Sequence, residues 1–492
     1  MARLTELRFD NSYARLHPAF YEVVDPAPLP DPYLVTFNPA AAELLDLDPS
    51  EGGNPALVEY LGGVRRLPGS EPLAQAYAGH QFGVWVPQLG DGRAFLLGEV
   101  RNARGESWDL HLKGGGRTRF SRFGDGRAVL RSTIREYLAC EALHGLGIPT
   151  TRALAIIGSD LPVQRERIET AATLLRLSPS HVRFGTFQYF AARGEVDRVR
   201  ELADYLIGRH LRVLLKLEGP DRYAAWFGEV CRSTARLLAQ WMAVGFAHGV
   251  MNTDNMSVLG LTLDYGPYGF LDEYDAGFIC NHTDSEGRYA FNQQPGIALW
   301  NCARFGEALM VLGESERWQT ELDSYWEEFL TSYRTLLLAK LGLRDLAGAA
   351  PDTAELDSLI SDLLKVLQAE RTDYTLFFRM LSEEGGTGHR SIVGAGCSGA
   401  MQAWLACYTD RLRAEGGEDA ERADGMRRVN PKYVLRNWIA QEAIAEAQAG
   451  RFELIEELRV LFADPFGEHP GMERFAEPPT AAAREIAVSC SS

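Results

Sequence analysis

The feature that most constrains the fold is a change in hydrophobic period along the chain. Between residues 83 and 113, short apolar runs with alternating polar residues predict strands. Beyond about residue 193, apolar residues recur every three or four positions, as in amphipathic helices, near residues 200–215, 223–244, 317–341 and 433–449. This order predicts the α+β fold class, with a β-rich first part and a mainly helical second part.

Composition excludes several classes of protein. The chain has 492 residues, 46% of them hydrophobic and 24% charged, which is the balance of a globular protein with a large core. A formal net charge of −17 argues against nucleic acid as a partner, because neutralising phosphates requires a concentrated positive surface. There is no signal peptide in the first 20 residues and no apolar stretch long enough to span a bilayer. We therefore expect a cytoplasmic monomer with no membrane partner.

Glycine-rich turns and alternating residues indicate how the first part is built. The runs 83–89 and 93–101 are joined by Gly90-Asp91-Gly92, which predicts a hairpin, and a turn at 102–106 leads into a third strand, 107–113. Polar residues alternate along this strand, so Lys113 ends it on its polar face. A helix is expected over 128–144, with Glu136 in its middle, and residues 1–75 read as an irregular extension rich in proline.

Lys113 on a strand end and Glu136 on the next helix match the way in which kinases hold an ammonium group over nucleotide phosphates. Taken alone, each residue could equally be an ordinary surface charge. Their order within three strands and a helix favours the functional interpretation.

Two glycine-rich segments could hold an anionic ligand. Gly90, Gly92 and Arg93 have the position of a kinase glycine loop without its full pattern, and a plain hairpin is the alternative. The second segment, 114–127, includes Asp125 and Gly126 and several arginines just before a helix N-terminus, which suits phosphate groups. The sequence lacks the GxxxxGK[ST] pattern, so a Walker-type nucleotide site is excluded.

The segment from His248 to Asn255, followed by Asp264-Tyr265-Gly266, has the order of a kinase catalytic loop and metal-binding triplet. Asn255 and Asp264 could offer oxygen ligands to magnesium, although single Asn and Asp residues often only cap turns. The position of the kinase base is taken by Val250, which cannot accept a proton. The nearest substitute is Asp254, so either activity is lost or a different group is transferred.

Arg176 and Arg183 lie between the two predicted parts of the chain and could clamp terminal phosphates. In a chain with 45 arginines, exposed surface charge is the alternative interpretation.

Several strings together resemble the selenoprotein O family over nearly the full length. They are 76–83 (AYAGHQFG), 112–116 (LKGGG), 248–256 (HGVMNTDNM), 264–267 (DYGP), 294–296 (QPG), 430–433 (NPKY) and the terminal 490–492 (CSS). The resemblance implies a protein-kinase-like fold of two lobes that binds ATP in a flipped orientation and transfers AMP to Ser, Thr or Tyr hydroxyls of protein substrates. It implies four segments: an N-terminal extension (1–75), a nucleotide-binding N-lobe (76–190), a helical C-lobe (191–425) and a C-terminal extension with a cysteine-containing tail (426–492).

The same resemblance assigns roles to matching positions. Asp254 would accept the proton, Glu136 would hold Lys113, and Asn255 and Asp264 would bind Mg²⁺ or Mn²⁺. The residues expected to contact nucleotide and phosphates are Gly90, Gly92, Arg93, Lys113, Asp125, Gly126, Arg176, Arg183 and Asp264. Selenium-containing members carry selenocysteine where this chain has Cys490, which suggests redox control through pairing with Cys280. UMP transfer from UTP, conventional kinase activity and a non-catalytic nucleotide-binding scaffold remain open at this point.

Overall fold

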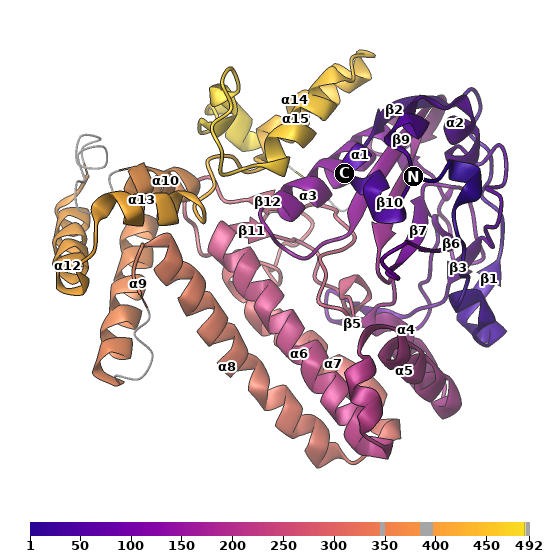
Figure 1. Cartoon of the computed structure of the whole chain (residues 1–492), viewed down its shortest axis with the longest axis horizontal. Coiled ribbons are helices and arrows are strands. Elements are labelled where there is room, and N and C mark those ends of the chain that lie inside the picture. Colours follow the sequence, from indigo (N-terminus) through magenta and orange to yellow (C-terminus); the bar gives the residue numbers. More distant parts are fainter. Residues whose placement is uncertain (345–349, 384–396, 487, 489–492) are drawn as a thin grey trace.

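The computed structural model describes residues 1–344, 350–383, 397–486 and 488, and it confirms the α+β class (Figure 1). A twisted sheet formed by the first part of the chain lies beside a group of long helices formed by the second part. Among the described residues, no helix has the length and the apolar character needed to cross a bilayer.

The large sheet is antiparallel at every pairing between its strands. Its order is β1 (Tyr21–Val23), β3 (Leu73–Gln75), β6 (Ala94–Arg101), β7 (Ser107–Lys113), β10 (Ile168–Ser178), β9 (Arg152–Gln164) and β2 (Tyr33–Phe37), with β8 (Ala128–Val129) paired to β10. The turn at 102–106 joins β6 and β7 as predicted, and β7 ends at Lys113. The long β9–β10 hairpin was not predicted.

The prediction of a hairpin at Gly90-Asp91-Gly92 is wrong, because the strands on either side of this turn do not pair with each other. Residues before this turn form β5 (Val84–Val86), which pairs with β4 (Gly79–Gln81) in a separate sheet of two strands, whereas β6 pairs with β3 and β7. The physical reason lies in Asp91, because its N–H donates to Gln75 O at 2.9 Å and its carboxylate accepts from Gln75 N at 3.0 Å. These bonds attach the turn to β3 instead of closing it on itself.

Residues 1–75 are more regular than the extension that we expected. They supply β1, β2 and β3, and β1 and β2 occupy the two edges of the sheet. The segment 24–32, which we call the strap, connects these edges and contacts the second glycine-rich segment. Ala27 N donates to Gly115 O at 2.7 Å, and Arg127 donates to the carbonyls of Ala27 and Pro28 at 3.0 Å.

Helix α3 (Leu130–Gly145) packs against β9 and β10 and carries Glu136 at its centre. It begins two residues later than predicted because Ala128 and Val129 pair with β10 as β8. Two helices near the C-terminus, α14 (Asn437–Gln448) and α15 (Glu453–Ala463), pack on α3, as Figure 1 shows. Strands that follow α3 in the sequence and helices near the C-terminus therefore hold this helix in place.

The helical part contains the helices that the periodicity predicted, with shifted ends. Its elements are α4 (Phe184–Ala191), α5 (Val196–His210), α6 (Gly219–Val244), α7 (Gln294–Leu309), α8 (Ser315–Lys340), α9 (Ala350–Glu370), α10 (Tyr374–Glu383), α12 (Gly399–Glu415) and α13 (Asp419–Arg427). Helices α6 and α8 lie side by side along most of their length (Figure 1). Between α6 and α7, β11 (Phe246–Ala247) pairs with β12 (Gly269–Phe270) and encloses the loop 248–268.

Candidate active site

A cavity of about 620 Å³ lies where the sheet meets the loop 248–268. Its walls come from the turn after β5, the end of β7, the second glycine-rich segment, β10 and the loop itself. Of the residues predicted from the sequence, those lining it are Gly90, Gly92, Arg93, Lys113, Asp125, Gly126, Arg176, Arg183, Asp254, Asn255 and Asp264. Residues separated by up to 174 positions in the sequence thus converge on one space.

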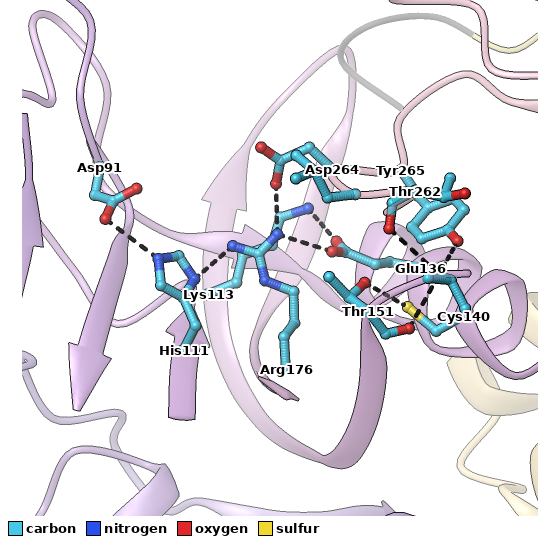
Figure 2. A network of polar contacts seen from close by, with 12 residues as sticks. Asp91, His111, Lys113, Glu136, Cys140, Thr151, Arg176, Thr262, Asp264 and Tyr265 are labelled. Atoms are coloured by element: carbon cyan, nitrogen blue, oxygen red, sulfur yellow. Dashed lines mark hydrogen bonds and ion pairs between the residues drawn. The ribbon is translucent and has the colours of Figure 1, made fainter. Parts of the chain in front are cut away.

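Lys113, which lines the cavity, forms an ion pair with Glu136 behind it on α3 (Figure 2). Glu136 is fully buried on α3, and its second carboxylate oxygen accepts from Arg176 Nη1 at 3.0 Å. Burial alone would raise the pKa of Glu136, but the charges of Lys113 and Arg176 outweigh it and hold the pKa below its usual range. The carboxylate therefore stays ionised and fixes two cations at the cavity.

Asp264 is held by two arginines that point into the cavity. One carboxylate oxygen pairs with Arg176 Nη1 and the other with Arg183 Nη1, and both guanidinium groups are almost fully buried. Burial raises the pKa of Asp264, but the charges of Arg183 and Arg176 outweigh it, so the pKa lies well below its usual value. The backbone of Asp264 has φ +58°, a left-handed conformation that costs energy for a non-glycine residue and is often found at functional sites.

His111 and Asp91 hold Arg176 from the opposite side and were missed from the sequence. His111 Nδ1 lies 2.7 Å from Arg176 Nη2, and Nε2 lies 3.2 Å from the Asp91 carboxylate (Figure 2). Burial lowers the pKa of His111, so the neutral ring accepts from Arg176 and donates to Asp91. The signal that could have found His111 is the strand alternation, which puts it on the same face as Lys113.

Asp254 is nearly buried and has one free oxygen. Its Oδ2 accepts from Gln81 Nε2 at 3.2 Å, whereas Oδ1 has no hydrogen-bond partner among the described residues. Arg183 donates to the main-chain carbonyl of Asp254 at 2.7 Å. Burial raises the pKa of Asp254 to about 6, against the opposing effect of Gln81. A carboxylate of this kind is ionised at pH 7 and accepts a proton more readily than an exposed aspartate does.

Asn255 follows Asp254 in the short 3₁₀ turn Thr253–Asn255 and donates from its side-chain amide to Val250 O at 2.9 Å. Within the described part of the chain, no group of three or more His, Cys, Asp or Glu side chains could hold a metal ion by itself. The amide oxygen of Asn255 and the carboxylate of Asp264 are nevertheless oxygen donors in one cavity. Such a pair fits a magnesium-type ion that takes its other ligands from phosphate oxygens and water.

Arg165 is another site residue that the sequence did not reveal, and it comes from the turn between β9 and β10. It forms a two-pronged ion pair with Asp125, at 2.7 and 3.0 Å, and donates to Arg127 O at 2.8 Å. The Asp125 carboxylate also accepts from Arg127 N at 2.8 Å. These bonds fix the end of the second glycine-rich segment at the mouth of the cavity.

His248 has a structural position. Its ring stacks on Trp241, and ring Nε2 lies 3.0 Å from Leu263 O. The main-chain N–H of His248 donates to Gln294 Oε1 at 2.9 Å. The ring thereby connects the start of the loop to the residue before Asp264. His248 positions the loop without lining the cavity.

Comparisons with known proteins identify the family. The sequence model of the family described as "Protein adenylyltransferase SelO" matches residues 3–461. The chain is also 55% identical to the "Protein nucleotidyltransferase YdiU" of Myxococcus xanthus and 53% identical to that of Thioalkalivibrio sulfidiphilus, over 100% of each chain. The protein of the same name from Thiobacillus denitrificans is 51% identical, again over 100% of both chains. This chain belongs to the SelO family.

Membership of the SelO family confirms the resemblance seen in the sequence and makes the chain an enzyme, a protein nucleotidyltransferase. The family model covers β1 through most of α15, so it includes every element that lines the cavity. Four of the strings that carried the resemblance, 76–83, 112–116, 248–256 and 264–267, lie in or beside the cavity.

The cysteines predicted to control a SelO enzyme are only partly described. Cys280 is buried behind the loop, with Sγ 3.5 Å from Ala247 O. The C-terminal tail reaches this region, because Val488 O accepts from His282 N at 3.1 Å and lies 2.8 Å from His282 Nδ1. Cys490 lies outside the described residues, so a redox role for this pair stays a prediction.

Proposed function

We propose that this enzyme transfers AMP from ATP to Ser, Thr or Tyr hydroxyls of proteins. The observation that carries the proposal is Asp254. The position of the kinase base holds Val250, while Asp254 brings an ionisable carboxylate to the wall of the cavity. A base at a different place in the site suits attack at a different phosphorus, which is the expectation for ATP bound in a flipped orientation.

The cations around the cavity support a triphosphate as the ligand. The buried Glu136 carboxylate holds Lys113 and Arg176, and the partly exposed Asp264 holds Arg183. Arg93 and the glycine-rich segments complete the walls. Fixed cations and backbone N–H groups stabilise charge that develops on transferred phosphoryl oxygens, without reorganisation during the reaction. We infer that Gly90, Gly92, Asp125 and Gly126 also contact the nucleotide.

We also propose that the sheet with α3 and the helical part correspond to the two lobes of a protein-kinase-like fold, divided near residue 190. The lysine at a strand end and its glutamate on the next helix support this assignment. So does the loop enclosed by β11 and β12. Residues 1–75 and 426–492 would be extensions of this fold, although 1–75 contribute strands to the sheet.

The reaction follows from these positions. The substrate hydroxyl oxygen forms a bond to the α-phosphorus, the bond from that phosphorus to the bridging oxygen of the β-phosphate breaks, and pyrophosphate leaves. The Asp254 carboxylate takes the hydroxyl proton. Lys113 and the two arginines stabilise the negative charge on the phosphates. Asn255 and Asp264 would hold Mg²⁺ or Mn²⁺, which when bound neutralises phosphate charge.

The position of a radioactive label in ATP tests the proposal. The full chain is incubated with a general protein acceptor and with ATP labelled either at the α- or at the γ-phosphate. Label on protein from the α-position alone supports AMP transfer, whereas label from the γ-position indicates a conventional kinase. Thermal stabilisation by ATP with no label on protein indicates a scaffold.

Two further comparisons refine the result. UTP labelled at the α-phosphate, with magnesium or with manganese, distinguishes UMP transfer from AMP transfer and identifies the preferred ion. A cytoplasmic location and a monomeric state are predictions that cell fractionation and light scattering check.

A further inference from the structure

The segment 77–82 carries part of the sequence string that most clearly marks the family, yet the proposed reaction assigns it no role. It contains β4 and lies against the short turn 253–255 that carries Asp254. Its backbone fixes this turn, since His80 N donates to Thr253 Oγ1 at 2.7 Å and Phe82 N donates to Asn252 Oδ1 at 3.1 Å. Two side chains of the loop are thus held by main-chain groups of β4 and the residue after it.

Tyr77 extends the same contact toward the arginines. Its ring lies under the Arg183 guanidinium, 4.6 Å from ring centroid to Cζ. Arg183 in turn donates to Asp254 O and pairs with Asp264. The segment therefore supports the loop at both of its proposed functional carboxylates.

The Asp254 side chain itself is confined from two sides. Gln81 Nε2 donates to Oδ2 at 3.2 Å. Gly79 lies under the same carboxylate, because a Cβ placed on Gly79 would be 2.6 Å from Oδ1 and 3.0 Å from the Asp254 Cβ. Oδ2 is thus bonded to Gln81, and Oδ1 is buried against Gly79 with no hydrogen-bond partner among the described residues. These two contacts fix the orientation of the carboxylate.

We propose that Gln81 is a positioning residue for Asp254, with Gly79 providing the space in which the carboxylate sits. Gln81 orients the Asp254 carboxylate for proton transfer from the substrate, and it leaves nucleotide binding to other groups. This inference rests on the proposed function, because it gives Asp254 the role of proton acceptor.

The test measures AMP transfer from α-labelled ATP by the full chain and by three variants. Gln81→Met keeps the length of the side chain and removes the donor, whereas Gly79→Ala displaces the same carboxylate from the other side. Gln88→Met is the matched control, because it makes the same chemical change at a residue that is exposed and lies outside the cavity. We expect kcat to fall about tenfold or more in the first two variants, as for loss of a hydrogen bond to a charged group. KM and the dissociation constant of ATP stay within about twofold, and Gln88→Met matches the wild type.

The outcomes separate the inference from the proposed function. A wild-type chain that labels no protein overturns both, whereas an active wild type with a fully active Gln81→Met overturns the inference alone. A higher KM with unchanged kcat also overturns it, since Gln81 would then contact a substrate instead of the base. Loss of ATP binding or of unfolding stability in Gln81→Met would give this residue a general structural role and refute a positioning role.

Discussion

Lys340 places an amine inside the helical part, where no acid in the described part of the chain balances its charge. It is the last residue of α8, its side chain is buried, and among the described residues no carboxylate lies within salt-bridge distance. The amine lies 4.3 Å from the ring centroid of Phe378 and 5.6 Å from that of Tyr374, both on α10. Burial lowers the pKa of Lys340 from 10.5 to about 7. The fold therefore disfavours the charged amine.

The lowered pKa gives the free-energy cost of burying the Lys340 ammonium group. A pKa lowered from 10.5 to about 7 corresponds to about 5 kcal/mol against the ammonium form in the folded protein. The folded-state pKa lies below the unfolded one, so between pH 7 and 10.5 the unfolded chain binds more protons. The free energy of unfolding of the wild type must therefore rise with pH in this window.

Replacing the amine by an apolar group of similar length removes this cost. We expect Lys340→Met to raise the free energy of unfolding by about 4 kcal/mol at pH 7, and the advantage to shrink by about 1.4 kcal/mol per pH unit above it. Urea unfolding followed by tryptophan fluorescence at pH 7, 8 and 9 measures both. Lys365→Met is the control, because Lys365 is 71% exposed, and we expect a change below about 0.5 kcal/mol at each pH. A Lys340→Met variant less stable than the wild type would refute the reasoning. So would a difference in free energy of unfolding between the two proteins that does not change with pH.

Three further predictions concern the cavity. Lys113→Ala and Asp264→Asn should each lower turnover more than about tenfold in the label-transfer assay, and the Asn variant retains an oxygen for the buried arginines. Asp254→Asn should lower turnover more than about a hundredfold with ATP affinity within about threefold by calorimetry, because it removes only the proposed proton acceptor. Arg165→Ala frees Asp125, so the KM for ATP should rise severalfold while kcat stays within about twofold. Unchanged turnover in Lys113→Ala, Asp264→Asn and Asp254→Asn would place the reaction elsewhere.

Local patterns in the sequence predicted those parts of the site that depend on one element each. Strand alternation gave the position of Lys113, and a helical period gave that of Glu136 on α3. The loop 248–268 stood out because its Asn and Asp residues are spaced as ligands and lie between two helical stretches. In each case the signal lay within about twenty residues.

The parts that were missed depend on contacts between distant segments. Gln81 meets Asp254 across 173 positions, and Arg165 meets Asp125 only because the unpredicted β9–β10 hairpin brings it there. The hairpin at Gly90-Asp91-Gly92 was wrong for the same reason, since a bond to Gln75 outweighed a local turn preference. No periodicity in a single sequence reports such pairings.

The first 37 residues, in which the strap joins β1 to β2, supply the strands at both edges of the large sheet. Both margins of the large sheet are closed by strands made early in synthesis, β1 and β2, while the strands between them come later. A chain shortened at its start would uncover the hydrogen-bonding edges of β3 and β9 together, and exposed edges of this kind recruit strands from neighbouring molecules. Such a chain should aggregate even though every residue lining the cavity is still present.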